Sequence, residues 1–382
     1  MKVKIHKLFD YLMDTTAEKP EAVLGFSLSS PPRLGDFIAD LDPSLSLDWN
    51  AESFQGLPAL RSHVLREAGL EGCCELDDVL ITAGAAEANY LVMRQLLQPG
   101  DEFIVETPGW PQAGVMAKAL ETRTRYIKRL ETDGWAFPME ELRQAVNART
   151  KLVFLTNPNN PTGRLLSAEE LTEIAKIAAA HGAYVLVDEV YAGLEWDGAR
   201  RPSIAALYER GITTGSVSKA LGLQGLRTGW LICRDKDVIL DAVILRENSS
   251  EIMNIMGEVI AEVAMRPERY RNALLTARQE GAANLDKLDR FIAEQPLLSW
   301  VRPQAGLIGL ARLHSNMTGE QFARQLLAPP YRTFLIPGEA YDEPNHIRLG
   351  VGGGAAVNLD EGLRRAAALL RTLQAGAAAI SS

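Results

Sequence analysis

Short uninterrupted apolar runs alternate with amphipathic segments through the first two thirds of the chain, and this pattern constrains the fold more than any other feature. A strand that is apolar on both faces must be covered on both faces, as in parallel sheets flanked by helices. We therefore expect an α/β fold with a mostly parallel sheet between two layers of helices. The clearest elements are helices at 57–68 and 168–181, strands at 78–82, 102–105, 152–156 and 183–187, and a further strand at 229–233 that is a candidate for antiparallel pairing.

The pattern changes after about residue 265. An amphipathic stretch at 267–293 predicts a connecting helix, and shorter strand patterns and a helix at 359–373 follow. This α+β pattern indicates a second, smaller domain, and 382 residues are enough for two domains. The prediction is a large domain of residues 46–265 and a small domain formed by 1–45 together with 266–382, whose tail at 375–382 is expected to fray.

The composition argues against several classes of partner. Lys and Arg number 40 against 49 Asp and Glu, giving a net charge of −9, whereas nucleic acids and anionic membranes favour a basic surface. No run of about 18 apolar residues occurs, and no apolar segment follows the first residues, so a cytoplasmic protein without membrane contact is predicted. The three cysteines, Cys73, Cys74 and Cys233, have no metal-site spacing, and no metal is expected.

The most informative segment is residues 215–230, where Lys219 lies in a turn rich in Ser and Gly. A solvated surface lysine is the simplest interpretation of Lys219 taken alone. Ser216, Ser218, nearby glycines and Arg227 together suit a ligand that carries a phosphate group. A lysine in an apolar pocket or beside cations has a lowered pKa and can form an imine with an aldehyde.

Two further motifs follow predicted strands. Residues 157–163, Asn-Pro-Asn-Asn-Pro-Thr-Gly, come directly after the strand at 152–156, and Asp188 ends the next one. The first motif is also compatible with a plain rigid turn, and a strand-end acid with a helix cap. Ligands of open α/β sheets bind at the carboxyl ends of the strands, however, and a buried Asp188 would need a partner such as a protonated pyridine nitrogen.

Taken in order, these motifs resemble those of the fold-type-I pyridoxal 5′-phosphate (PLP) enzymes, specifically the class I/II aminotransferases. The resemblance covers residues 50–235 most strongly. It implies the aspartate aminotransferase-like fold, in which a large domain with a mostly parallel seven-stranded sheet carries a smaller α+β domain. It also implies PLP as cofactor, an amino acid and a 2-oxo acid as substrates, and a homodimer.

The resemblance implies a role for each matching residue. Lys219 would hold PLP as a Schiff base and shuttle the proton, and Asp188 would pair with the pyridine nitrogen. Asn160 and Tyr191 would bond the phenolic oxygen of the cofactor, and Trp110 would stack on its ring. Arg348 would bind the substrate α-carboxylate, and Asn160 and Trp110 would also contact the substrate. The phosphate would be held by Gly84, Ala85, Ala86, Ser216, Ser218 and Arg227. Without a functional role, Trp110 would be an ordinary core or surface residue and Arg348 an exposed strand residue.

Three positions depart from the family pattern. Ala86 stands where a Ser or Thr is usual, and Ala51 stands where many relatives have a tyrosine that reaches the neighbouring subunit. The segment 25–32 lacks the usual Gly-x-Pro signature, and its Ser-Ser run is similar to that of cyclases acting on hydroxylated arginine.

These departures keep two catalytic hypotheses open. The first is a PLP-dependent aminotransferase that moves the α-amino group of an amino acid to a 2-oxo acid through Lys219. The alternative is a PLP-dependent lyase or cyclase that performs elimination or replacement on the same fold. A third hypothesis, a non-catalytic regulator, would require a DNA-binding module, and the roughly 50 residues that precede the sheet show no helix-turn-helix pattern or basic stripe. The identity of the amino acid is not predicted.

Overall fold

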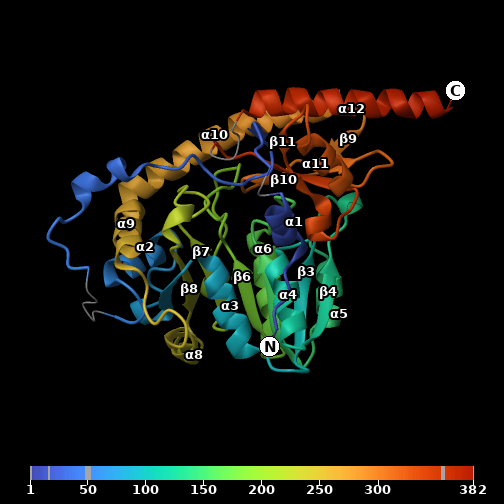
Figure 1. Ribbon diagram of the computed structural model, residues 1–382. Helices are drawn as coiled ribbons and strands as arrows, with labels where there is room; N and C mark the ends of the chain where they lie inside the picture. The colour runs from blue at the N-terminus through green and yellow to red at the C-terminus, as the bar shows by residue number, and fades with distance from the viewer. Residues whose placement is uncertain (1, 16–17, 48–52, 354–357, 382) are drawn as a thin grey trace.

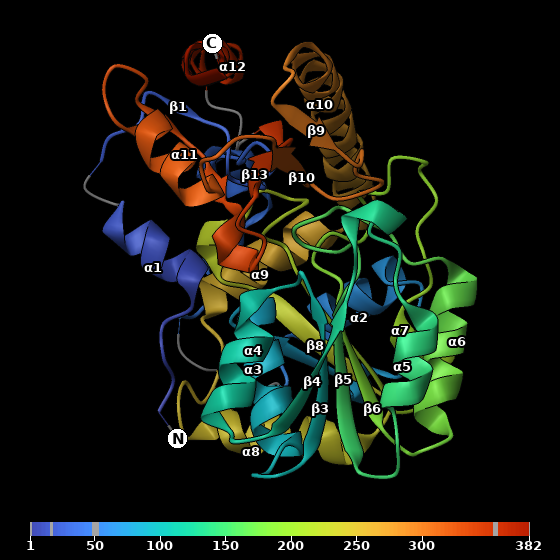
Figure 2. The same ribbon diagram turned by 90° about the vertical axis from the view of Figure 1, so that its right-hand side faces the viewer.

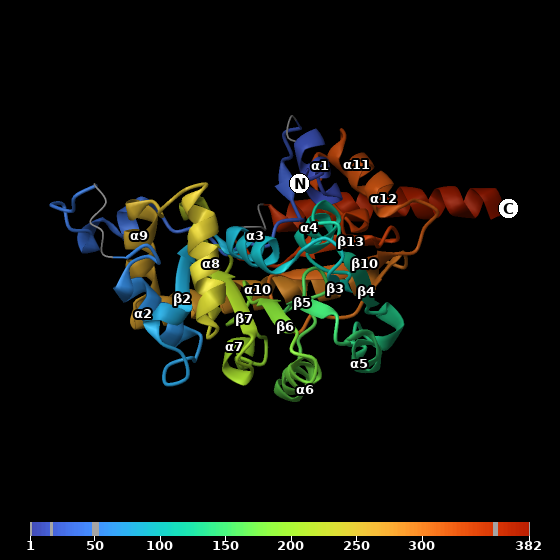
Figure 3. The ribbon, with the colours of Figure 1, turned by 90° about the horizontal axis from the view of Figure 1, so that it is seen from below.

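A computed structural model of the chain describes residues 2–15, 18–47, 53–353 and 358–381. Its largest element is a seven-stranded sheet with the strand order β2-β8-β7-β6-β5-β3-β4, which Figure 3 shows from one edge to the other. Only β8 runs antiparallel to its neighbours. The strands are β2 (Val79–Thr82), β3 (Glu102–Thr107), β4 (Arg123–Lys128), β5 (Thr150–Thr156), β6 (Tyr184–Asp188), β7 (Gly211–Ser216) and β8 (Gly229–Cys233). The predicted mostly parallel sheet is therefore confirmed.

Helices cover both faces of this sheet, as Figures 2 and 3 show. Leu152 and Phe154 of β5 face a core formed with α3, α4 and α8, whereas Val153 and Leu155 face the core formed with α5 and α6. This two-sided burial explains the continuous apolar runs in the sequence. The helices are α2 (Pro58–Glu67), α3 (Ala85–Leu96), α4 (Pro111–Ala119), α5 (Met139–Ala145), α6 (Ala168–Ala179), α7 (Ile204–Leu207), α8 (Lys236–Glu247) and α9 (Ile255–Met265).

The long helix α10 (Pro267–Glu294) leads from α9 to the C-terminal elements (Figure 1). These elements form a four-stranded antiparallel sheet in the order β12-β13-β10-β9. Its strands are β9 (Leu298–Trp300), β10 (Ile308–Leu313), β12 (Ile336–Pro337) and β13 (His346–Gly350), accompanied by α11 (Gly319–Leu327) and α12 (Leu359–Ser381). One core joins residues of α10, this sheet, α11 and α12.

The N-terminal segment packs against these C-terminal elements. Strand β1 (Ala22–Val23) pairs in parallel with β11 (Thr333–Phe334), and Leu8 and Tyr11 of α1 (Lys7–Asp14) belong to the same core. Residues of α1 and β1 therefore pack with the C-terminal part, whereas Phe37 belongs to a core with α2 and β2. The domain boundaries at residues 46 and 266 themselves stay a prediction.

Two strands and one helix end differ from the sequence-based expectation. Strand β4 is largely exposed and β7 is rich in Gly and Thr, so neither shows an apolar run. Helix α12 continues to Ser381, although residues 375–382 were expected to fray, and the alanine-rich composition there favours helix.

Short 3-10 helices complete the fold at Leu34–Asp36, Ile38–Asp40, Leu76–Asp78, Glu131–Asp133, Gln224–Leu226 and Gly338–Tyr341. Within the described ranges, no helix is long and apolar enough to cross a membrane.

Candidate active site

A cavity of about 330 Å³ lies at the carboxyl ends of the central strands. Thr156 ends β5, Asp188 ends β6 and Ser216 ends β7, and all three line it. This is the edge at which open α/β sheets bind ligands. Of the residues singled out in the sequence, the cavity brings together Ala85, Ala86, Trp110, Asn160, Asp188, Tyr191, Ser216, Ser218, Lys219, Arg227 and Arg348, and Gly84 lies directly beside it.

Lys219 is buried in this cavity, three residues after β7 ends. Burial lowers the pKa of its amine to about 8, with further lowering by the positive charges of Arg348 and Arg227, while Asp188 acts in the opposite direction. The uncharged amine is the nucleophilic form. A lysine in this setting is suited to form an imine near neutral pH, in contrast to a solvated lysine.

Asp188 is held in a fixed orientation. The Asn89 side-chain amide donates a 2.8 Å hydrogen bond to its Oδ2, and the Val190 backbone N–H donates one of 3.2 Å to its Oδ1. Burial raises the pKa of the carboxyl to about 6 despite these bonds. A cation arriving in the cavity would stabilise the ionised form, so Asp188 suits a positively charged partner.

The turn between β2 and α3 approaches Arg227 closely. Gly84 has a φ of +85°, and a Cβ at this position would lie 2.6 Å from Nη2 of Arg227. Gly229 is also needed, because its Cβ would lie 2.6 Å from the carbonyl carbon of Gly84. The N-terminus of α3, the Arg227 guanidinium and the hydroxyls of Ser216 and Ser218 therefore gather where an anion can bind.

Arg348 on β13 faces the cavity from the C-terminal sheet. Its guanidinium donates to Asn160 Oδ1 (3.3 Å), to Tyr341 Oη (2.6 Å) and to the Gly25 carbonyl (2.8 Å). Its Nε is buried and has no hydrogen-bond partner among the described residues. Arg348 is 4% exposed, so the alternative of an exposed strand arginine is wrong. A buried guanidinium with an unused donor suits an anionic group.

Several polar residues of the site were not predicted. Besides its bond to Asp188, Asn89 accepts a 2.8 Å hydrogen bond from Thr214. Gln112 donates to the Ala86 carbonyl (2.7 Å) and accepts from Trp110 Nε1 (3.3 Å), and Ser27 shares a 2.7 Å hydrogen bond with the Tyr191 hydroxyl. One signal was available for Asn89, which is a polar residue among the buried apolar residues of α3. Ala51, the position of the missing tyrosine, lies outside the described residues.

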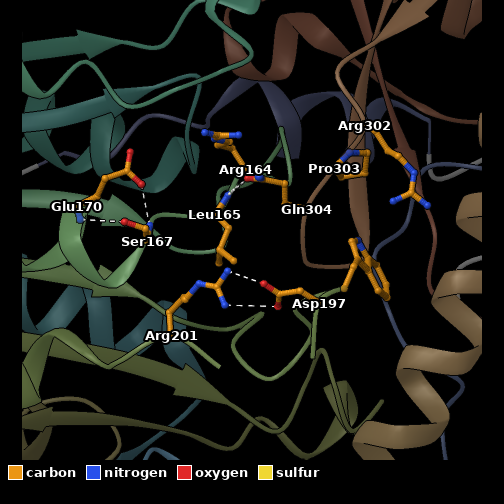
Figure 4. Close-up of a pocket in the computed structure, with 10 residues that line it drawn as sticks. Arg164, Leu165, Ser167, Glu170, Asp197, Arg201, Arg302, Pro303 and Gln304 are labelled. Atoms are coloured by element: carbon orange, nitrogen blue, oxygen red, sulfur yellow. Dashed lines mark hydrogen bonds and ion pairs between the residues drawn. The ribbon is translucent and has the colours of Figure 1, made fainter. Parts of the chain in front are cut away.

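A second cavity of about 510 Å³ contains none of these residues. Figure 4 shows Arg201 pointing toward Asp197, with which it forms a 2.6 Å ion pair, and Ser167 paired with Glu170 at the start of α6. Arg302 at its rim pairs with Asp289 at 2.6 Å. Its described lining residues include no lysine that could form an imine, so this cavity is the weaker candidate for catalysis.

The first cavity fits PLP on the chemistry of its donors. Lys219 supplies an amine for an aldehyde, and Asp188 supplies a carboxylate for a protonated ring nitrogen. Arg227 and the glycine-dependent turn at Gly84 supply an anion-binding end. No group of three or more possible metal ligands occurs in the part of the chain that the structure describes.

Comparisons with known proteins identify the family of the chain. The model of the family "Aminotransferase class I and II" matches residues 52–365. An aspartate aminotransferase of Geobacillus stearothermophilus is 30% identical over 308 residues, or 77% of each chain. Capreomycidine synthase of Streptomyces vinaceus is 27% identical over 274 residues, covering 71% of this chain and 69% of the synthase. A solved PLP-dependent aminotransferase from Streptococcus suis superimposes with a TM-score of 0.87 at 28% identity, covering 98% of this chain and 99% of that one.

The family match spans most of the chain, and the fold agrees along nearly its whole length. The predicted fold, family and cofactor are thereby confirmed. The chain belongs to the class I and II aminotransferases, and it is a PLP-dependent enzyme that moves the α-amino group of an amino acid to a 2-oxo acid.

Proposed function

We propose that Lys219 carries the cofactor and moves the proton during transamination. The observation behind this assignment is a buried amine with a pKa of about 8 that shares one cavity with Asp188, Arg227 and Arg348. Bound PLP supplies an electron sink that makes the hydrogen on the substrate α-carbon acidic. Once the substrate has displaced it, the Lys219 amine is a base near neutral pH that can take that proton and return it.

Asp188, Asn160 and Tyr191 are proposed to control the cofactor ring. The fixed carboxylate of Asp188 would keep the pyridine nitrogen protonated, and Asn89 keeps that carboxylate oriented. Asn160 and Tyr191 would bond the phenolic oxygen. Burial raises the pKa of Tyr191 to about 12, so its hydroxyl stays protonated and able to donate. Trp110, at the cavity wall, would stack on the ring.

The phosphate is proposed to bind at the opposite end of the cavity. Backbone N–H groups of Gly84, Ala85 and Ala86 would donate to it, together with Ser216, Ser218 and Arg227. Ala86 adds no hydroxyl, in contrast to the Ser or Thr usual in relatives.

Arg348 is proposed to bind the substrate α-carboxylate. It is buried, comes from the C-terminal sheet and reaches Asn160 across the cavity. This supports a substrate site between the proposed domains 46–265 and 1–45 with 266–382.

We further propose a cytoplasmic homodimer that serves in biosynthesis. For the dimer, Leu34 (61%) and Ile38 (59%) lie four residues apart on one exposed segment and offer apolar surface to a second copy of the chain. Two-fold dimers are also the commonest assembly.

A lyase or cyclase remains the second candidate. One of the relatives is named capreomycidine synthase, and the Ser27-Leu28 segment lines the cavity with Ser27 bonded to Tyr191. The two reactions differ in the fate of the nitrogen. An aminotransferase gives a stoichiometric amount of oxo acid and passes ¹⁵N from the labelled amino acid to the cofactor, whereas a cyclase or lyase leaves the cofactor in its aldehyde form.

Lys219→Ala tests the assignment directly. Borohydride reduction of the loaded wild-type protein should fix the cofactor on the peptide that contains Lys219, as seen by mass spectrometry. In Lys219→Ala the adduct and all turnover should be lost, because another amine is not placed to replace it. Lys176→Ala, at an exposed position of α6, is the control and should behave as wild type. An adduct that persists in Lys219→Ala would contradict the assignment.

A further inference from the structure

We infer that the amino acid substrate carries an uncharged, apolar side chain, bound against residues of α1, the segment after β1, and β12. This inference rests on the proposed function. The polar cavity residues are largely accounted for by the proposed cofactor and α-carboxylate contacts. The rest of the wall consists mainly of the apolar residues Leu8, Leu12, Phe26, Leu28, Val190 and Ile336, together with the polar residues Ser27, Thr156 and Gln224.

Helix α1 provides one side of this wall. Leu8 and Leu12 are four residues apart and therefore lie on the same face of the helix. The helix is anchored to the C-terminal elements by the burial of Leu8 and Tyr11 in their core, and exposed ion pairs of Lys7 with Asp342 and of Asp14 with Arg324 lie at its two ends. The two leucines are thus held over the cavity.

The segment after β1 provides the other side, next to the proposed carboxylate site. Arg348 donates to the carbonyl of Gly25, and the following residue, Phe26, lines the cavity with its ring centroid 5.1 Å from that of Phe334. The backbone fits tightly here, because a Cβ on Gly350 would lie 1.8 Å from the Phe26 carbonyl oxygen. A substrate whose carboxylate binds Arg348 would place its side chain near this wall.

The charges of the cavity argue against a charged substrate side chain. Among its described lining residues, the cations are Lys219, Arg227 and Arg348, and the one carboxylate is Asp188. Each has a role in the proposed function, so the described cavity lining of this chain offers no further charge to pair with a distal carboxylate or guanidinium. Burying such a charge without a partner is costly, whereas burying apolar groups against leucine and phenylalanine is favourable.

The first test compares amino acids on the loaded wild-type protein in its native assembly. Leucine, methionine and phenylalanine should convert the cofactor to its amine form with kcat/KM at least about tenfold above those of aspartate, glutamate and arginine, because each buried methylene group contributes about a factor of four. Faster conversion by a charged amino acid would overturn the inference while leaving the aminotransferase assignment intact. Failure of every amino acid to release an oxo acid would overturn the proposed function itself.

The second test changes the wall. Leu12→Lys should lower kcat/KM for leucine about tenfold or more and raise the ratio of aspartate to leucine turnover, because it places a cation in the apolar subsite. Met13→Lys is the matched control, since the neighbouring side chain on the same helix is 59% exposed and does not line the cavity. The cofactor spectrum and melting temperature should match in the two variants.

Leu12→Ala tests the same wall without introducing a charge into the folded protein. It should reduce the preference for leucine over alanine, because the methyl groups that contact the longer side chain are removed. An aspartate-to-leucine ratio that is the same in Leu12→Lys and Met13→Lys, or a leucine preference unchanged in Leu12→Ala, would overturn the inference.

Discussion

Arg348 shows how a single side chain connects the two parts of the site. It lies on β13, yet its guanidinium reaches Asn160, which follows β5 in the large sheet. A planar guanidinium can bind both oxygens of a carboxylate and so fix the α-carbon relative to the cofactor, whereas a lysine provides only a point charge.

Arg348→Lys should therefore lower kcat/KM by about one to two decades, equivalent to roughly 1.5–3 kcal/mol for a charge-assisted hydrogen-bonded contact. Cofactor binding should be unchanged, because the phosphate is expected at the other end of the cavity. Steady-state kinetics and the cofactor spectrum measured together check this. Unchanged turnover with an intact spectrum would remove Arg348 from the substrate site.

Among single residues, those that lie close together in one sequence motif could be predicted as site residues. Lys219, Arg227 and the serines lie within one short segment, and the structure brings them into one cavity with Asp188 and Arg348. The sequence analysis did not identify Asn89, because its contact with Asp188 joins residues that are 99 positions apart in the chain. Such a partner depends on how α3 is oriented over the sheet, which single-sequence patterns do not reveal.

At the scale of elements, the turn from β2 into α3 determines the shape of the proposed phosphate site. Gly84 combines a positive φ with the close approach of Arg227. Gly84→Ala should lower the free energy of unfolding by about 1–3 kcal/mol through backbone strain, and it should also weaken cofactor binding by displacing the guanidinium.

Gly100→Ala separates these two effects. Gly100 has a similar φ of +86° but nothing within 4 Å of an added Cβ. This control should therefore lose stability through strain while keeping the cofactor affinity of the wild type. Equal cofactor dissociation constants for the two variants, measured by fluorescence titration, would show that the turn at Gly84 does not shape the cofactor site.

Elements with an apolar run could be predicted, and those without one could not. Strand β5 is buried on both faces and its sequence shows this directly. Strand β7 was missed because it is buried through Thr and Gly rather than through large apolar residues, and β4 because it is an exposed edge strand. The antiparallel pairing expected for residues 229–233 is confirmed in β8, which pairs antiparallel with β2 and β7.

At the scale of the whole molecule, ionisable groups at the end of β6 couple the stability of the large sheet to pH. Glu189 follows Asp188 and accepts hydrogen bonds from Ser203 (3.0 Å), from Thr213 (3.2 Å) and from the backbone N–H of Ile204 (3.2 Å). Burial nevertheless raises the pKa of its carboxyl from 4.5 to about 7. The proposed mechanism gives this residue no catalytic task, so its ionisation should affect mainly stability.

The raised pKa of Glu189 determines whether the free energy of unfolding rises or falls with pH. Below about pH 4.5 the carboxyl is protonated in both the folded and the unfolded chain, and the stability that it contributes is fully present. As the pH rises toward 7, the unfolded chain releases this proton first, so the free energy of unfolding falls. Above the folded-state pKa the loss is complete.

Glu189→Gln should consequently remove part of the pH dependence of unfolding, because the amide stays uncharged and can still accept hydrogen bonds from Ser203 and Thr213. Between about pH 5 and about pH 8, the wild type should lose on the order of 1–3 kcal/mol more than the variant. Urea unfolding of both proteins at the two pH values measures this difference, and comparing the variant with wild type cancels the contribution of Asp188, whose pKa is also raised. A variant that loses as much stability as the wild type would mean that Glu189 is already ionised in the folded protein at pH 5, with its negative charge balanced by the nearby Arg200.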